Sequence, residues 1–154
     1  MPTLHLLLER EEALRDTALR RLQQAEDDAR RAQSQAEMLA GYRDEYRARW
    51  GAQFAQGASV SVVQCYRGFM TRLDDAIAQQ QRHAAQAAAH AGQCRDELAA
   101  RQVRVASVRR LIERRAHEQR RGAVRREQKA GDEAAARLQR AAAPWPAVAV
   151  GGGA

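Results

Sequence analysis

The sequence has few aromatic residues, few helix breakers and few cysteines. Only 5% of its 154 residues are aromatic, and it contains 3 prolines, 10 glycines and 2 cysteines. Small side chains cannot fill a thick globular core at native packing density, and strand-forming residues are scarce, so a sheet-based enzyme domain is excluded. Cys65 and Cys94 cannot form a disulfide framework. The leucine run at 6–8 is too short to cross a bilayer, which needs about 20 apolar residues.

Alanine, arginine, glutamate, glutamine and leucine dominate instead, and all are strong helix formers. We therefore expect two long helices with one break between them. The expected parts are helix 1 of a coiled coil, a connector, helix 2 and a disordered tail, at residues 3–50, 51–60, 61–142 and 143–154.

Particular residues set these expected boundaries. Gly51 and Gly57 favour the connector, and Pro144 ends the second helix. Ser61 is the expected N-cap of that helix, with Gln64 completing a capping box.

Apolar residues recur in steps of three and four along both expected helices, which is typical of a coiled-coil seam. The first helix contributes Ala18, Leu22, Ala25, Ala29, Ala32, Ala36 and Leu39. The second contributes Met70, Leu73, Ile77, Ala84, Ala87, Ala91, Cys94, Leu98, Val105, Val108 and Ile112, with Gln80 and Arg101 interrupting. A ten-residue connector permits only antiparallel neighbours. The sequence thus predicts an all-α, antiparallel two-helix coiled-coil hairpin.

The turn near residue 56 would pair residue i with about residue 111 − i, so that Leu39 faces the region of Leu73. On this pairing the second helix extends beyond the first from about residue 109. Residues 109–129, here called the basic segment, carry nine basic and three acidic residues. A field of this strength favours an acidic partner.

No catalytic or metal-binding motif is present. The sequence contains no glycine-rich phosphate loop, no Cys-x-x-Cys and no His-Glu-x-x-His. His90 and Cys94 are spaced to share a helix face, but two ligands make a poor zinc site, and we interpret Cys94 as a buried seam thiol. Asp74 and Asp75 are adjacent on a helix and point apart, so they cannot share a proton. We expect no enzyme activity, no cofactor and no metal.

The aromatic residues gather on both sides of the connector: Tyr42, Tyr46, Trp50 and Phe54 before it, and Tyr66 and Phe69 after it. Two stripes with steps of four, three and four run through this region, at Gln35, Leu39, Tyr42 and Tyr46 and at Phe69, Leu73, Ala76 and Gln80. Such stripes fit a seam and a partner-binding surface equally well, because tyrosine suits both.

Three stretches carry a resemblance to a known family: residues 38–47, residues 66–81 and residues 125–133. They are MLAGYRDEYR, YRGFMTRLDDAIAQQQ and RREQKAGDE. Together with the length and the position of the connector, they resemble the flagellar export protein family FliJ over about residues 4–140. Gln80 stands where we associate a histidine with the family.

The resemblance implies a stalk-like coiled coil of the flagellar type III export apparatus. Such proteins insert in the hexameric ring of the export ATPase, bind the cytoplasmic domain of the membrane export gate and interact with export chaperones. The gate-binding surface maps to Gln35, Leu39, Tyr42, Tyr46, Phe69, Leu73 and Ala76. We add Arg114, Arg115, Arg120 and Arg121 of the basic segment as the expected ring contact. The implied location is the cytoplasm, at the inner face of the membrane, through the partners.

Two other readings remain open at this point. The equivalent stalk of a virulence-type injectisome would share the hairpin and the basic segment. A basic coiled coil that binds nucleic acid is the other reading, although we expect no nucleic-acid partner. An amphipathic helix at a membrane surface has little support, because the basic segment lacks a broad face of large apolar residues.

Overall fold

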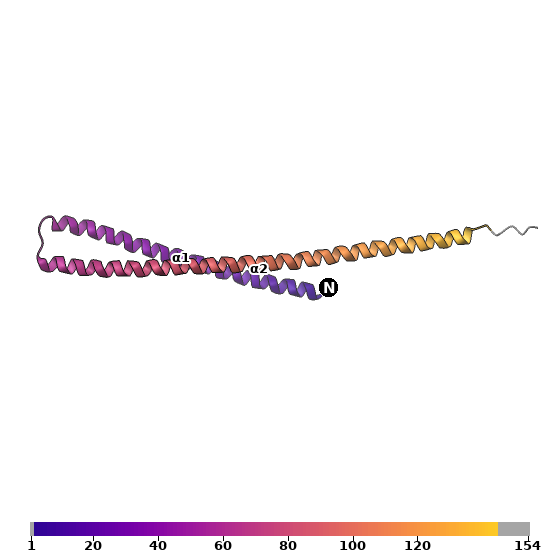
Figure 1. Ribbon diagram of the computed structural model, residues 1–154, viewed down its shortest axis with the longest axis horizontal. Helices are drawn as coiled ribbons and strands as arrows, with labels where there is room; N and C mark the ends of the chain where they lie inside the picture. The colour runs from indigo at the N-terminus through magenta and orange to yellow at the C-terminus, as the bar shows by residue number, and fades with distance from the viewer. Residues whose placement is uncertain (1, 145–154) are drawn as a thin grey trace, which may run out of the picture. The chain divides into compact units, whose positions relative to one another are not determined.

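The computed structural model describes residues 2–144, and these form two long α-helices and no strand (Figure 1). Helix α1 spans Pro2–Phe54 and helix α2 spans Val60–Ala142. The prediction of an all-α fold with a longer second helix is confirmed, since α1 has 53 residues and α2 has 83. The tail expected over 143–154 lies outside the described residues from position 145 onward.

The connector is shorter than predicted, because α1 continues through Gly51 to Phe54. The helix closes with two tight turns, in which Gln56 N–H donates to the Gln53 carbonyl at 3.2 Å and Gly57 N–H donates to the Phe54 carbonyl at 3.1 Å. Gly57 has a φ of 96°, a left-handed conformation that glycine adopts without a steric penalty. Gly57 is therefore the residue that ends the first helix, and the predicted break at Gly51 is wrong.

The second helix begins with a different serine from the one predicted. The hydroxyl of Ser59 accepts from the Val62 N–H at 3.4 Å, and the Ser59 carbonyl accepts from the Val63 N–H at 3.1 Å. These two bonds define Ser59 as the N-cap of α2. Ser61 lies inside the helix, so the capping box expected with Gln64 does not form.

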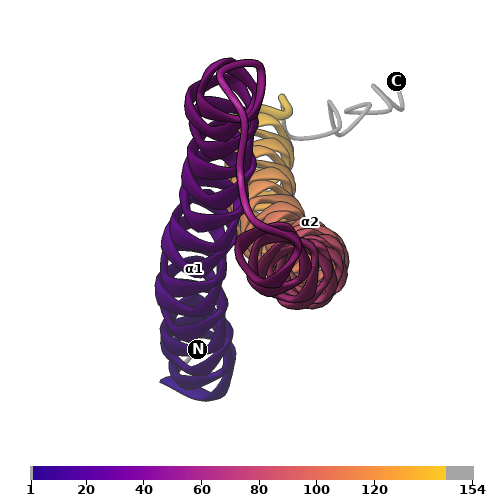
Figure 2. The ribbon, with the colours of Figure 1, turned by 90° about the vertical axis from the view of Figure 1, so that its left-hand side faces the viewer.

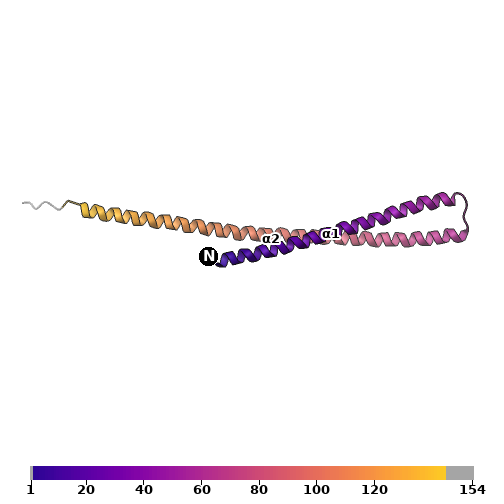
Figure 3. The same ribbon diagram turned by 180° about the vertical axis from the view of Figure 1, so that it is seen from behind.

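The described chain divides into two units, one ending at Val108 and the other beginning at Arg109. In the first unit α1 and α2 lie side by side and antiparallel, joined by one short loop (Figure 2). Seen from either side, α1 crosses this part of α2 at an incline, passing from one edge of it near the turn to the other edge near the N-terminus (Figures 1 and 3).

The seam between the helices consists mainly of the residues that the heptad pattern selected. Buried members of α1 are Ala18, Leu22, Ala25, Ala32 and Ala36, and buried members of α2 are Met70, Leu73, Ile77, Ala84, Ala91, Cys94, Leu98 and Val105. Ala29, Leu39 and Ala87 are only partly buried. Since alanine dominates the middle of the seam, the two backbones can approach closely there.

The pairing between the helices is shifted from the predicted one. The rule 111 − i would place Glu26 opposite Ala85, whereas Arg95 Nη2 donates to Glu26 Oε1 at 3.2 Å. Near the turn, Gln80 Nε2 donates to Gln35 Oε1 at 3.0 Å, where the rule would place Ala76. The shift follows partly from the turn itself, because the loop between Phe54 and Val60 is centred beyond residue 56.

The second unit contains the rest of α2, residues 109–142. Nearly all of its side chains are exposed, including every arginine of the basic segment. Over residues 2–144, neither helix has a stretch that is long and apolar enough to cross a membrane.

Candidate partner-binding face at the turn

The seven residues mapped to the gate surface, here called the tip face, fall into three classes of burial. Gln35 and Ala76 are exposed, and Tyr42 is 44% exposed. Leu39, Tyr46 and Phe69 are partly buried, and all three pack against a buried cluster of Met70, Leu73 and Ile77. Leu73 is the one buried member of the tip face. The tip face thus combines exposed groups with groups that anchor it to the core.

The aromatic members of the tip face form a continuous row across both helices. The ring centroids of Tyr42 and Tyr46 lie 4.8 Å apart on α1, and those of Tyr46 and Phe69 lie 5.2 Å apart between α1 and α2. Both ring pairs are tilted, an arrangement that aromatic pairs favour. A partner that covers this row would contact both helices at once.

Tyr42 is the ring of this row with the greatest freedom to contact a partner. A hydrogen bond to the Tyr46 side chain raises the pKa of Tyr42 above its ordinary value of 10.0, and partial burial adds to the rise. At neutral pH the phenol is therefore an uncharged donor or acceptor on an apolar ring, a combination common at protein interfaces.

Two ion pairs between the helices lie beside this row. The Asp74 carboxylate on α2 forms ion pairs with two arginines of α1, with Arg43 Nη1 at 3.5 Å and Arg47 Nη2 at 3.8 Å. Pairs as exposed as these contribute less than about 1 kcal/mol each. They nevertheless link α1 and α2 close to the point where Tyr46 meets Phe69.

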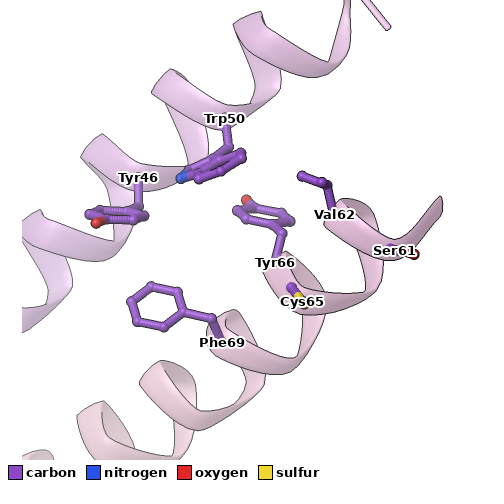
Figure 4. A pocket seen from close by; sticks show the side chains of 7 residues that line it. All are labelled: Tyr46, Trp50, Ser61, Val62, Cys65, Tyr66 and Phe69. Carbon is purple, nitrogen blue, oxygen red and sulfur yellow. The ribbon is translucent and has the colours of Figure 1, made fainter. Parts of the chain in front are cut away.

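An apolar cavity of about 490 Å³ adjoins the tip face on the side of the turn. Figure 4 shows Tyr46 and Trp50 on α1 facing Tyr66 and Phe69 on α2 across it, with Val62 and Cys65 completing the wall. The ring centroids of Trp50 and Tyr66 lie 5.9 Å apart. Large rings occupy the space between the helices here without filling it, whereas alanines close the middle of the seam.

The tip face, as mapped from the family resemblance, does not include Trp50 and Tyr66, although their spacing in the sequence predicts that both belong to the same surface. Trp50 follows Tyr46 by four residues, and Tyr66 precedes Phe69 by three, so each continues its stripe toward the turn. Phe54 joins them, with its ring 5.1 Å from that of Tyr66. The aromatic surface at the turn is therefore larger than the seven mapped residues.

The arginines expected to contact the ring of the export ATPase lie in the second unit. Arg114, Arg115, Arg120 and Arg121 are all exposed on α2. Beside them, His117, Arg120, Arg121, Val124 and Arg125 border a shallow depression of about 360 Å³. This surface is cationic and includes one exposed apolar side chain, since Val124 is 55% exposed.

Of the pair considered for metal binding, Cys94 belongs to the seam and His90 is exposed. Cys94 is 6% exposed within a cluster that includes Leu22, Ala25 and Leu98, and its Sγ lies 3.7 Å from His90 Nε2. No group of three or more histidine, cysteine or acidic side chains is placed to hold a metal ion in residues 2–144. Cys94 therefore packs as a small apolar residue.

Comparisons with known proteins identify the family. A family model described as "Flagellar FliJ protein" matches residues 1–143. No curated protein and no solved structure matches the chain. The family match covers both helices, the turn and the basic segment, and the fold has the two long helices that the resemblance implied. The chain belongs to the flagellar FliJ family, and it is a protein associated with flagellar type III export.

Proposed function

We propose that this protein is a stalk-like coiled coil of the flagellar export apparatus, which inserts in the ring of the export ATPase, binds the export gate and handles export chaperones. The family match supports the system in which it acts. The observation that carries the proposal is the row formed by Tyr42, Tyr46 and Phe69, which joins both helices and leaves Tyr42 exposed.

The tip face is the proposed binding site for the cytoplasmic domain of the gate. Interface energy concentrates in a few aromatic anchors that contact the partner's own pockets. Tyr42 supplies such an anchor, while Tyr46 and Phe69 support it from below through their contacts with the buried cluster. Gln35, Leu39, Leu73 and Ala76 complete the proposed surface.

The basic segment is the proposed contact with the ATPase ring, through Arg114, Arg115, Arg120 and Arg121. Nine basic residues against three acidic ones create a field that attracts an acidic surface. The proposed protein has no catalytic activity of its own and uses no cofactor. It acts in the cytoplasm, at the inner face of the membrane, through its partners.

Two sets of substitutions separate the two proposed contacts. Binding of purified protein is measured against the ATPase and against the cytoplasmic domain of the gate. Tyr42→Ala should weaken binding to the gate and leave ATPase binding unchanged. The double substitution Arg114→Glu with Arg121→Glu should weaken binding to the ATPase and leave binding to the gate unchanged. If the wild-type protein binds neither partner, the proposed function is wrong; if every variant weakens both contacts equally, the assignment of the two sites is wrong.

The injectisome stalk remains the alternative with the same fold. Genes beside this one settle the choice, since flagellar genes support the proposal and virulence secretion genes contradict it. The family model that matches is the flagellar one, which favours the first.

A further inference from the structure

The arginines of the basic segment occur as four adjacent doublets, at 109–110, 114–115, 120–121 and 125–126. Adjacent residues on an α-helix point about 100° apart, so the two members of a doublet cannot contact the same partner row. The second unit is helical through all four doublets. Adjacency in the sequence therefore does not identify the arginines that share a helix face, whereas their spacing along the helix does.

One member of each doublet falls on a single helix face. Arg110, Arg114, Arg121 and Arg125, with His117 between them, are separated by steps of four, three, four and four. Residues three and four apart are neighbours on a helix surface, so these five side chains form one row about 22 Å long. All five are exposed, and we call them the arginine row. The other members of the doublets, Arg109, Arg115, Arg120 and Arg126, lie outside this row, although Arg120 borders the same shallow depression as Arg121 and Arg125.

The row is narrow, because acidic residues border it. Helical geometry places Glu113 on one side of the arginine row and Glu118 on the other, and both are exposed. A duplex phosphate backbone approaching this face would meet those carboxylates as well as the arginines. A row of carboxylates on a protein helix, also spaced by three and four residues, is as narrow as the arginine row and can be aligned with it.

Composition favours a protein partner too. Residues 109–142 contain no tryptophan, tyrosine or phenylalanine, so this helix offers no ring for stacking on bases or for insertion at a membrane surface. Val124 lines the depression together with Arg121 and Arg125 of the row, and it suits the methylene groups of a glutamate whose carboxylate lies between these two arginines.

We propose that the arginine row, and not the doublets as such, docks an acidic helix of the export ATPase whose carboxylates repeat every three to four residues. This inference rests on the proposed function, and it reassigns the expected contact: Arg114 and Arg121 belong to the row, and Arg115 and Arg120 do not. At about 0.15 M salt the screening length is about 8 Å, so neighbouring arginines of the row act together on one partner face.

The test compares two double variants that remove the same charge from this helix. Arg121→Gln with Arg125→Gln lies in the row, and Arg115→Gln with Arg126→Gln lies off it, on another side of the helix. All four side chains are exposed on the same helix. Circular dichroism should show equal helical content for both proteins, which makes the second variant a matched control for net charge and folding.

Affinity for the purified ATPase is then measured at low and at physiological salt. The variant in the row should lose about tenfold in affinity and show a weaker salt dependence, since two charge pairs are removed. The control should lose less than about twofold. Equal losses would show that the overall field, and not one face, makes the contact, and would overturn the arginine row while leaving the proposed function intact.

Three further outcomes are decisive. No loss in either variant, with wild-type binding intact, places the ATPase contact elsewhere on the chain. A wild-type protein that does not bind the ATPase overturns the proposed function together with this inference. A DNA duplex that displaces the ATPase, and whose own binding falls equally in the row variant, shows a general polyanion surface and contradicts a specific acidic helix.

Discussion

Tyr42 and Phe69 belong to the same aromatic row, yet their surroundings predict opposite effects of truncation. Phe69 packs against the buried cluster of Met70, Leu73 and Ile77 and meets the ring of Tyr46. Tyr42 is 44% exposed and meets only the edge of this assembly, through Tyr46. Substituting each by alanine therefore separates support of the fold from contact with a partner.

The magnitude for Phe69→Ala follows from its partial burial. Removing a fully buried phenylalanine ring costs about 3–5 kcal/mol, so a partly buried ring should cost about 2–3 kcal/mol. For a chain of this size that loss lowers the melting temperature by about 5–10 °C. Tyr42→Ala should leave the melting temperature nearly unchanged, because the lost ring is exposed and alanine is the better helix former.

Both variants are assayed in two ways on the same preparations. Thermal unfolding followed by circular dichroism gives stability, and titration with the cytoplasmic domain of the gate gives affinity. Tyr42→Ala should lower the affinity about tenfold or more, as truncation of an interface anchor does. Phe69→Ala should lower affinity as well, but with the accompanying loss of stability.

A large fall in melting temperature for Tyr42→Ala would refute this reasoning, because it would mean that the ring is part of the core. Unchanged affinity for the gate in the same variant would remove Tyr42 from the proposed surface. Tyr42→Phe serves as the control for the hydroxyl, since it keeps the ring and removes only the phenolic oxygen.

Two further predictions test the seam and the burial of Cys94 within it. Ala84→Asp should destabilise the hairpin by several kcal/mol, because it buries an unpaired charge at a residue that is 6% exposed, whereas Ala85→Asp on the exposed side should be mild; equal melting temperatures would show that the seam is misplaced. A thiol reagent should label exposed Cys65 in the native protein and reach buried Cys94 only after denaturation, as counted by mass spectrometry, and rapid native labelling of both would contradict the packing of Cys94.

The seam was predictable from the sequence because a repeat in steps of three and four directly encodes which residues share a helix face. Every buried residue of both helices belongs to the predicted set. Gln80, which interrupts the apolar pattern, also fits the packing of the seam. Gln80 remains partly buried and satisfies its amide through Gln35 on the other helix, so a polar group within the seam keeps a hydrogen-bond partner.

The turn was predicted less well, because its signals are ambiguous. Gly51 looked like a break, but a long helix tolerates one glycine at a cost of about 1 kcal/mol. Gly57 is the glycine whose left-handed backbone stops the helix, and sequence spacing does not distinguish the two. The same ambiguity placed the predicted N-cap of α2 at Ser61, two residues after the observed N-cap at Ser59. An error at the turn also shifts the predicted pairing of residues along both helices.

The division of the tip face into supporting and exposed rings depends on how far the helices separate, and no stripe of residues encodes that distance. Alanine at the middle of the seam allows a close approach of the two helices, whereas the large rings of Tyr46, Trp50, Tyr66 and Phe69 line the space near the turn. An apolar cavity of about 490 Å³ lies among these rings. Burying exposed apolar surface of this kind is favourable for any partner that fits it. The contrast between small and large residues along one seam therefore supports the proposal of a gate contact at the turn, whereas the proposal of an ATPase contact is based on charge.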